Sequence, residues 1–237
     1  MSLDTFVFSS RGGMQENQDS VLGMTSETGG LFSLADGLGG VQNGAFASQT
    51  VTACLQRIWT ETSEWNSERL MDSVSKANKE VLVLQSKIGT EARSTVAVLV
   101  LQGNCALWGN TGDSRIYYLH ENKIGSITKD HSVAYMKYAA GEITREEIAE
   151  DPNQSRLLKT LGGEKDWQPD VYEGELQMND AFLLCSDGFW KYITDEEILI
   201  DRLKASSAKE WAFLMLLRIT DRLPENCDNL SLIAIVA

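Results

Sequence analysis

The sequence predicts a layered sandwich in which helices cover mostly antiparallel sheet. Three observations support this fold class: strand-like segments come in pairs joined by short polar turns, amphipathic helical stretches separate them, and two strand-like runs are apolar at nearly every position. With 237 residues and 43% hydrophobic content, the chain can build one large core. We find no linker-like segment, internal repeat or low-complexity tract, so residues 1–237 are expected to form a single domain.

Strand-like segments recur along the chain between turn signals. Residues 5–10 alternate between apolar and polar positions, and residues 31–36 form a short apolar run that ends at Asp-Gly. Residues 96–101 and 232–237 are apolar almost throughout, which is typical of strands covered on both faces. Hairpin turns at Gly103-Asn104 and Glu121-Asn122, and a third polar turn between 177 and 181, give further predicted strands at 94–102, 105–110, 115–120, 123–128, 171–177, 181–187 and 230–237.

Amphipathic helical stretches lie between these strands, at residues 43–60, 66–87 and 206–222. Thr194, with Glu197 three positions later, forms a capping box that predicts the start of another helix. Residues 131–162 mix short helical pieces with a glycine and a proline. We expect them to lie over a sheet edge as an insertion.

Charge and hydropathy exclude several kinds of partner. The chain has 34 acidic and 21 basic residues and a formal net charge of −13, so it would repel the phosphate backbone of a nucleic acid. Residues 1–10 lack the basic and apolar regions of a signal peptide. The longest apolar runs, such as 211–217, are far shorter than the roughly 18 residues of a membrane helix. We expect a cytoplasmic monomer that binds neither nucleic acid nor membrane.

The cysteines predict neither disulfides nor a zinc site. A zinc site needs closely spaced ligands, and the chain has only two histidines, His120 and His131. Buried free thiols in a reducing compartment are expected instead, because the four cysteines lie far apart without a C-x-x-C pair: Cys54, Cys105, Cys185 and Cys227.

Aspartates recur where predicted strands meet loops. If these strand ends converge, the carboxylates would repel one another strongly unless cations neutralise them. Ligand sets made only of oxygen favour Mg²⁺ or Mn²⁺ over zinc, and a glycine after an aspartate lets the backbone offer a carbonyl ligand. Taken singly, each aspartate is also explained by an ordinary turn or cap. The five positions are Asp19, Asp36, Asp113, Asp187 and Asp228.

Seven segments together carry a family resemblance: "ENQDS", "LFSLADGLGG", "GNTGDSRIYYL", "TKDHSVAYMKYAAGEIT", "LLKTLGG", "FLLCSDGFWKYITDEEI" and "DNLSLIAIV". In this order and spacing they resemble the PP2C-type (PPM family) metal-dependent protein serine/threonine phosphatases, and bacterial members in particular. The likeness covers essentially the whole chain. It implies an α+β fold, a four-layer α-β-β-α sandwich of two mostly antiparallel sheets flanked by helices, with residues 131–162 as a mobile flap beside the site.

The resemblance also implies a binuclear Mn²⁺ or Mg²⁺ centre, with Asp36, Asp187 and Asp228 at the heart of catalysis. Asp36 would bridge the two metals, the Gly37 carbonyl would bind one of them, and Asp187 and Asp228 would hold the first. Asp19 would serve the second metal through water, and Asp113 would help to hold a third, weaker ion. The implied reaction is hydrolysis of phosphoserine and phosphothreonine in proteins by a metal-activated water, without a phosphoenzyme. The implied partners are phosphorylated proteins and a cognate serine/threonine kinase.

Three positions depart from the family pattern. Gln18 stands where a glutamate is frequent, Met14 where many members have a phosphate-gripping arginine, and Leu38 where eukaryotic members have a histidine. Arg11 could replace the arginine only if the strand bulges at the glycines that follow it.

These departures leave alternatives open. His131 is a weak candidate for the general acid and is otherwise a helix-start residue. Two other functions remain: a catalytically weak pseudophosphatase that acts as a binding or scaffold protein, and a partner-switch phosphatase in transcription regulation.

Overall fold

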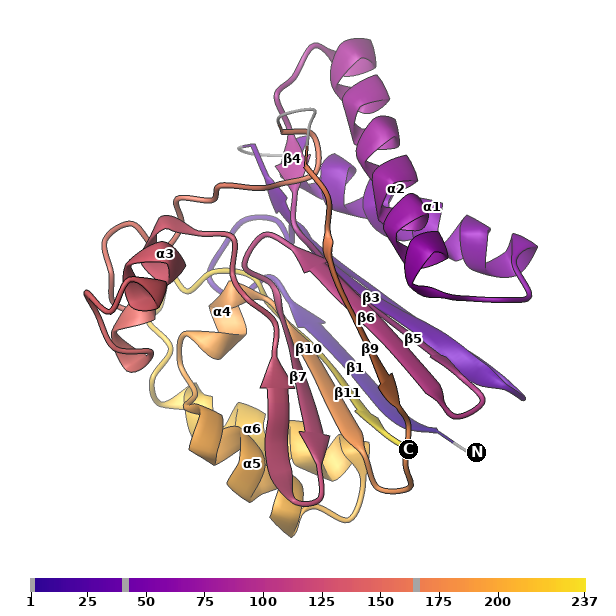
Figure 1. Ribbon diagram of the computed structural model, residues 1–237. Helices are drawn as coiled ribbons and strands as arrows, with labels where there is room; N and C mark the ends of the chain where they lie inside the picture. Colours follow the sequence, from indigo (N-terminus) through magenta and orange to yellow (C-terminus); the bar gives the residue numbers. More distant parts are fainter. Residues whose placement is uncertain (1–2, 40–42, 164–166) are drawn as a thin grey trace.

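Two antiparallel sheets lie face to face in the computed structural model, with helices on their outer faces (Figure 1). The structure describes residues 3–39, 43–163 and 167–237. Among these residues every strand pairing is antiparallel. The expected α-β-β-α layering is therefore confirmed.

Each sheet combines strands that are distant in the sequence. The first contains, in spatial order, β1 (Asp4–Ser10), β11 (Leu230–Val236), β10 (Ala181–Cys185), β7 (Arg115–His120) and β8 (Lys123–Ile127). The second contains β2 (Asp19–Ser26), β3 (Gly29–Leu38), β5 (Val96–Gln102), β6 (Cys105–Thr111) and β9 (Asp170–Glu175), with the short β4 (Arg93–Ser94) paired to the end of β3.

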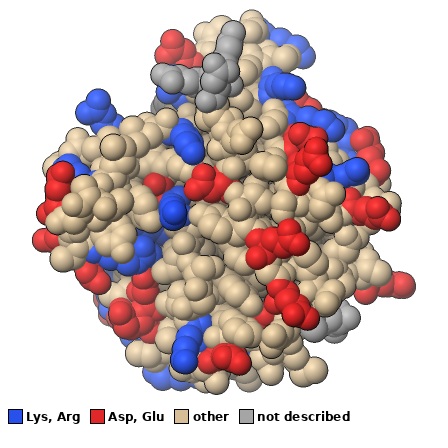
Figure 2. Space-filling view, viewed as in Figure 1, with Lys and Arg blue, Asp and Glu red and all other residues tan. Residues whose placement is uncertain are grey.

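Helices cover each sheet on the side away from its partner. The second sheet is covered by α1 (Asn43–Glu61) and α2 (Ser67–Ile88), and the first by α4 (Asp187–Trp190), α5 (Asp195–Lys204) and α6 (Ala208–Thr220) (Figure 1). Helix α3 (Val133–Ala139) and the 3₁₀ turn η1 (Glu146–Ile148) belong to residues 131–162, hereafter the flap segment. No described helix is long and apolar enough to cross a bilayer. Acidic and basic side chains are interspersed on the face drawn in Figure 2.

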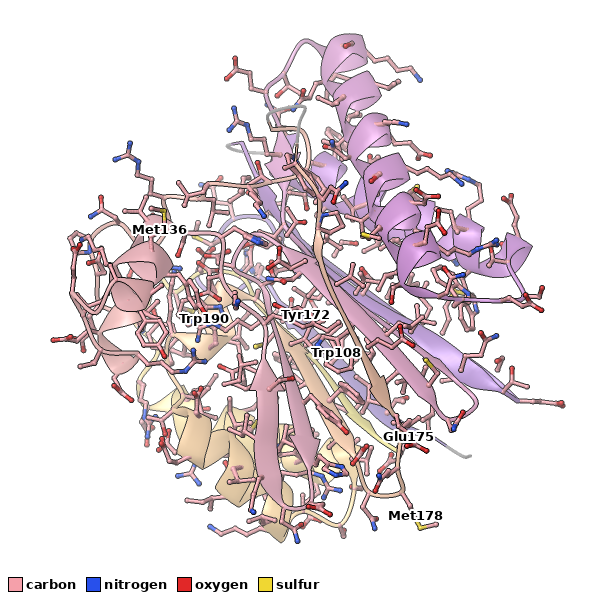
Figure 3. All side chains as sticks on the ribbon, in the orientation of Figure 1. Trp108, Met136, Tyr172, Glu175, Met178 and Trp190 are labelled. Carbon is pink, nitrogen blue, oxygen red and sulfur yellow. The ribbon has the colours of Figure 1, made fainter. Side chains whose placement is uncertain are left out.

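Three apolar layers hold the sandwich together. Between the sheets, Phe32, Leu99 and Phe182 are fully buried, and Trp108 stacks on Tyr172 with 5.9 Å between ring centroids (Figure 3). The other two layers lie under the helix pairs. Strand β5 serves two of these layers, because alternate residues point to opposite faces and all of residues 96–101 are buried. This explains its continuous apolar sequence.

Local signals predicted the turns correctly. Gly103 lies at φ +60° between β5 and β6, and Glu121 and Asn122 lie at φ 48° and 60° between β7 and β8. The capping box of Thr194 and Glu197 begins α5. Cys54, Cys185 and Cys227 are buried free thiols, as expected, whereas Cys105 is only partly buried.

The third predicted hairpin is wrong. Strands β9 and β10 follow each other in the chain but belong to different sheets. The connection crosses between the sheets because its Asp180 is buried and tied to β7: the Tyr118 hydroxyl donates to its carboxylate at 2.9 Å, and His120 Nδ1 lies 2.7 Å from it. The sequence analysis also missed β2 as a strand, and Asp187 begins helix α4 instead of ending a strand.

Leu99→Ala should lower the free energy of unfolding by about 3 kcal/mol, because it opens a cavity between two close-packed sheets. Leu99 is fully buried, whereas Leu217 is 69% exposed. Leu217→Ala is therefore the matched control and should stay within about 0.5 kcal/mol of wild type. Urea denaturation monitored by tryptophan fluorescence measures both variants. Equal destabilisation by the two would contradict the assigned core.

Candidate metal centre

Asp19 and Asp36 face each other across two neighbouring strands. Asp19 is the first residue of β2, Asp36 lies near the end of β3, and the antiparallel register pairs them directly. Directly opposite residues have Cα atoms about 4.5–5.5 Å apart and side chains on the same face of the sheet, and like charges in such a pair are destabilising. This pair needs a compensating charge.

The other sheet contributes Asp187 and Asp228 from two adjacent strands. Asp187 comes after β10 as the first residue of α4, and Asp228 precedes β11, which pairs with β10. Their close approach depends on Gly188: a Cβ there would lie 2.1 Å from the Asn229 carbonyl oxygen. The glycine after Asp187 therefore lets two segments pack at the end of the sheet.

Asp113 completes the group from the connection between β6 and β7, which links the two sheets. Its side chain is buried and accepts a hydrogen bond of 3.0 Å from Gln154 of the flap segment. Its backbone carbonyl accepts one of 2.8 Å from the Trp190 indole nitrogen. Both sheets and the flap segment thus contribute to this place in the molecule.

The pKa values indicate that the five aspartates interact electrostatically. Burial raises the pKa of Asp36 well above its usual range, and the negative charges of Asp19, Asp187, Asp113 and Asp228 add to this rise. The strand ends that carry these residues therefore converge, as the sequence analysis required. We call the five side chains the aspartate cluster.

Burial also raises the pKa of two further members of the aspartate cluster. Burial raises the pKa of Asp19 to about 7, with Ser186 opposing the rise and Asp187 adding to it. Burial likewise raises the pKa of Asp113 well above its usual range, and the negative charge of Asp187 contributes. Charge on these carboxylates is costly unless a cation is close.

Each carboxylate outside β3 is turned toward a protein donor. Asp19 Oδ2 accepts from the Ser186 hydroxyl at 2.9 Å, Asp187 Oδ2 lies 2.6 Å from Lys191 Nζ, and Asp228 Oδ1 accepts from the Asn229 N–H at 2.8 Å. Among the described residues, no group of three acidic, histidine or cysteine side chains is arranged to hold a metal ion as it stands.

The donor set nevertheless fits a hard divalent cation. It offers oxygen ligands only, which Mg²⁺ and Mn²⁺ prefer. Asp19 Oδ1 is buried and has no hydrogen-bond partner among the described residues, an arrangement that is costly for an isolated carboxylate oxygen. A cation between the strands would satisfy this oxygen and relieve the repulsion between Asp19 and Asp36.

Gly37 is held where only glycine fits. A Cβ there would lie 2.1 Å from the Gly44 carbonyl oxygen at the start of α1, and its N–H donates to the Gln18 carbonyl at 3.1 Å. This packing fixes the backbone beside Asp36. The role of the Gly37 carbonyl as a ligand stays a prediction, and the last residue of the glycine-rich run, Gly40, lies outside the described residues.

Side chains that the sequence analysis did not single out fix the backbone of the cluster. The Asn229 amide donates to the carbonyls of Arg11 and Glu16 at 3.0 and 2.9 Å and accepts from the Gln18 N–H at 2.7 Å, so it ties the segment before Asp19 to β11. The Thr95 hydroxyl accepts from the Asp36 N–H at 2.9 Å. In the sequence, the only signal for these two roles was that a polar residue, Asn229 or Thr95, stands directly before an apolar strand segment.

The positions that depart from the family pattern are also placed. Met14 is 44% exposed, and strand β1 ends at Ser10, so Arg11 lies beyond the strand and the condition of a strand bulge does not apply to it. Leu38 pairs with Arg93 at the end of β3. His131 lies just before Ser132, the N-cap of α3, which agrees with the helix-start interpretation; burial lowers its pKa.

Comparison with known sequences identifies a family and several relatives. The sequence profile described as "Protein phosphatase 2C" matches residues 9–218. The chain is similar to serine/threonine phosphatase stp of Listeria monocytogenes, at 31% identity over 195 residues that cover 79% of this chain and 74% of the relative. It is also 30% identical over 186 residues to serine/threonine protein phosphatase PstP of Mycobacterium tuberculosis, covering 77% of this chain and 35% of PstP.

Solved structures share the architecture over nearly the whole chain. The catalytic domain of PstP in complex with two manganese ions superimposes with a TM-score of 0.84 at 26% identity, covering 99% of this chain and 97% of that one. Serine/threonine phosphatase Stp1 of Staphylococcus aureus gives a TM-score of 0.89 at 25% identity, with coverages of 100% and 96%.

In EDTA, Asp19→Asn should raise the free energy of unfolding at pH 7 by about 1 kcal/mol or more, or about 2–4 °C in Tm for a domain of this size. The variant removes a buried negative charge opposite Asp36. The pKa of Asp19 is about 7 in the folded state and 3.8 when unperturbed. Because the folded state binds more protons, the wild type should lose stability as pH rises from about 4 to 7, and the variant should lose less.

Thermal denaturation between pH 4 and 8 measures this difference. Asp72→Asn is the matched control, because Asp72 is an exposed acid on α2, and it should follow the wild-type pH profile. An Asp19→Asn protein no more stable than wild type in EDTA at pH 7 would contradict the strain assigned to the cluster.

Proposed function

The chain belongs to the protein phosphatase 2C family, and from this premise we propose that it hydrolyses phosphoserine and phosphothreonine in proteins at the aspartate cluster. As a member of this family it is a serine/threonine phosphatase of the 2C type. The observation that carries the proposal is that five aspartates from the strand ends of both sheets and from the connection between the sheets lie together. The charges of the other four raise the pKa of Asp36, and the pKa values of Asp19, Asp113 and Asp228 are raised as well.

The cluster is proposed to hold two divalent cations, Mn²⁺ or Mg²⁺. The related PstP catalytic domain was solved with two manganese ions, which supports this number. Asp36 would contact both ions, the Gly37 carbonyl one of them, Asp187 and Asp228 the first, and Asp19 the second through water. When bound, two such cations lower the pKa of a water molecule toward neutrality and neutralise phosphoryl oxygens. A third, weaker ion at Asp113 is implied by the family resemblance alone.

The chain's own residues position this donor set. Asn229 fixes the segment that leads into Asp19, Thr95 fixes the backbone of Asp36, and Ser186 holds one oxygen of Asp19. Each of these bonds joins strands of the sandwich or a loop to a strand. The ligand oxygens are therefore placed by rigid elements, as precise catalysis requires.

We propose that no phosphoenzyme forms, because the neighbouring nucleophiles are unsuited to attack. Cys185 is fully buried in β10, and burial strongly raises the pKa of its thiol, which stays protonated. Ser186 is fully buried, its hydroxyl donates a hydrogen bond to Asp19, and its hydrogen-bond partners among the described residues include no histidine or lysine that could act as its base. A phosphorylated peptide of the enzyme itself, detected by mass spectrometry after rapid quenching, would contradict this.

A pseudophosphatase is the second candidate. It is favoured by exposed Met14 at the position of the phosphate-gripping arginine and by Gln18 in place of a glutamate. It predicts phosphopeptide binding without metal-dependent turnover. The complete set of five aspartates favours the active enzyme. Tests with a panel of phosphoproteins and their kinases would identify the substrate and would include the partner-switch alternative.

Asp36→Asn should lower Mn²⁺-dependent hydrolysis of p-nitrophenyl phosphate by about 100-fold or more, equivalent to about 2.7 kcal/mol of transition-state stabilisation. The substitution removes the charge that faces Asp19 and receives repulsion from all other members of the cluster. Asp72→Asn on α2 should retain wild-type turnover. Full activity in Asp36→Asn would exclude the cluster as the active site, and wild-type protein without Mn²⁺-dependent turnover would favour the pseudophosphatase.

A further inference from the structure

Lys191 lies inside the aspartate cluster. It follows directly after α4 and stands four residues beyond Asp187. Its Nζ lies 2.6 Å from Asp187 Oδ2, and the two side chains are only 20% and 10% exposed. At this distance in a mostly buried site, the pair is a strong charge-assisted hydrogen bond rather than a screened surface contact.

The surroundings keep the ammonium charged. Burial alone would lower the pKa of Lys191, but the negative charges of Asp187, Asp113 and Asp228 outweigh it and raise the pKa. The ammonium therefore interacts electrostatically with three of the five carboxylates. The positive charge of Lys191 partly opposes the rise in the pKa of Asp113 and of Asp228.

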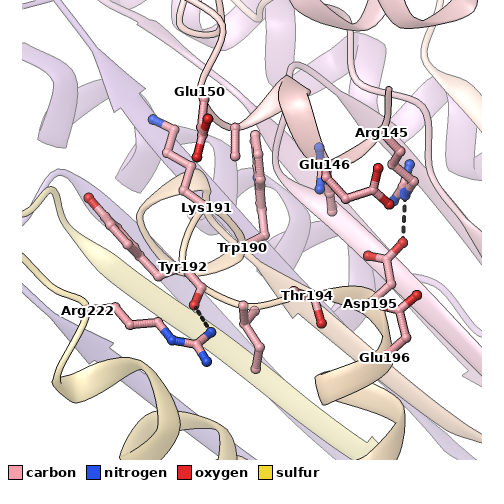
Figure 4. Close-up of a pocket in the computed structure, with 13 residues that line it drawn as sticks. Arg145, Glu146, Glu150, Trp190, Lys191, Tyr192, Thr194, Asp195, Glu196 and Arg222 are labelled. Atoms are coloured by element: carbon pink, nitrogen blue, oxygen red, sulfur yellow. Dashed lines mark hydrogen bonds and ion pairs between the residues drawn. The ribbon is translucent and has the colours of Figure 1, made fainter. Parts of the chain in front are cut away.

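The neighbouring cations are engaged elsewhere. Arg115 donates to both oxygens of Asp130, at 2.9 and 2.7 Å, and Arg145 lies 2.6 Å from Asp195. The two arginines and Lys191 border one pocket of about 330 Å³ between the flap segment and α4 (Figure 4). Glu146 and Glu150 also line this pocket, but within the described part of the chain the ion pair of Lys191 is made with Asp187.

Charge balance gives Lys191 a specific role in the cluster. Five carboxylates carry five negative charges, and two divalent cations leave one of them uncompensated. A monovalent ammonium supplies the missing charge, whereas a third divalent cation beside that ammonium would leave a surplus of positive charge. Asp187 can serve both kinds of cation, because Lys191 contacts Oδ2 and a metal could use Oδ1.

We propose that Lys191 is the third cation of the aspartate cluster, a tethered ammonium that remains at Asp187 beside Asp113 and takes the place of a third divalent ion. This inference rests on the proposed two-ion function of the same site. It makes the chain a two-ion protein, in contrast to the third ion that the family resemblance led us to expect at Asp113. The ammonium also orients the Asp187 carboxylate through this contact.

Ion counting tests the proposal directly and does not depend on turnover. The full chain is stripped with EDTA, dialysed against Mn²⁺ from micromolar to millimolar concentrations, and analysed for bound manganese by mass spectrometry. Lys191→Met removes the charge at similar length, Lys191→Gln is a second neutral variant, and Lys191→Arg keeps the charge. Lys137→Met is the matched control, because Lys137 forms a 2.7 Å pair with Asp151 within the flap segment.

Wild type, Lys191→Arg and Lys137→Met should saturate at two Mn²⁺ per chain. The neutral Lys191 variants should bind a third Mn²⁺ with a Kd at least about tenfold lower than any third-site binding by wild type. Circular dichroism establishes that each variant is folded. If neither neutral variant folds, the wild-type count still decides, because three tightly bound ions would overturn the proposal.

Two other outcomes would overturn it in distinguishable ways. Neutral variants that bind two ions but raise the KM for p-nitrophenyl phosphate would make Lys191 a phosphate ligand instead. That result would leave the proposed function intact. Wild-type protein that binds no Mn²⁺ and hydrolyses nothing would overturn the proposed function, and this inference with it.

Discussion

Mutual repulsion between carboxylates at one end of the sandwich is the constraint on which the site depends. Asp19 and Asp36 are forced together by the β2–β3 register, and Asp187 and Asp228 by the adjacency of β10 and β11. No local rearrangement separates them, because β3, β10 and β11 are buried in the core and β2 is paired with β3 along its whole length. The fold therefore stabilises an unfavourable charge arrangement, which a bound cation would relieve.

The three apolar layers and a few short contacts hold the strand ends in place in different ways. The apolar core between the sheets fixes their spacing, and the cores under the helices fix each sheet independently. Short contacts then place the strand ends: glycines 37 and 188 permit close backbone packing, and Asn229 and Thr95 hold the backbone on either side of the aspartates. Asp4 and Val236 pair with each other at the opposite end of the first sheet, whereas Ser10 pairs with Leu230, near Asp228 (Figure 1).

Much of the fold was predictable because its signals are local. Turn residues at Gly103-Asn104 and the box at Thr194 act within a few positions, and the seven motifs indicated the layering and the five aspartates. The crossing between β9 and β10 was not predictable, because buried Asp180 is held by β7, about sixty residues earlier in the sequence. Lys191 was missed for a similar reason: its spacing from Asp187 gains meaning only when residues 187–190 form a helix instead of a strand end.

The flap segment is fastened to both sheets, which bears on how the site can open. At its start, Asp130 receives two hydrogen bonds from buried Arg115 of β7, whose guanidinium carbon lies 3.5 Å from the centroid of the Trp190 ring. At its end, Leu161 and Ser94 of β4 exchange backbone hydrogen bonds of 2.8 and 3.0 Å. Gln154, between these anchors, contacts Asp113. Movement of the segment must therefore occur between two fixed ends, and any displacement of Gln154 alters the environment of Asp113. The Trp190 side chain links the start of the flap segment to the aspartate cluster, because it lies under Arg115 and donates to the Asp113 carbonyl, and it directly precedes Lys191 in the chain.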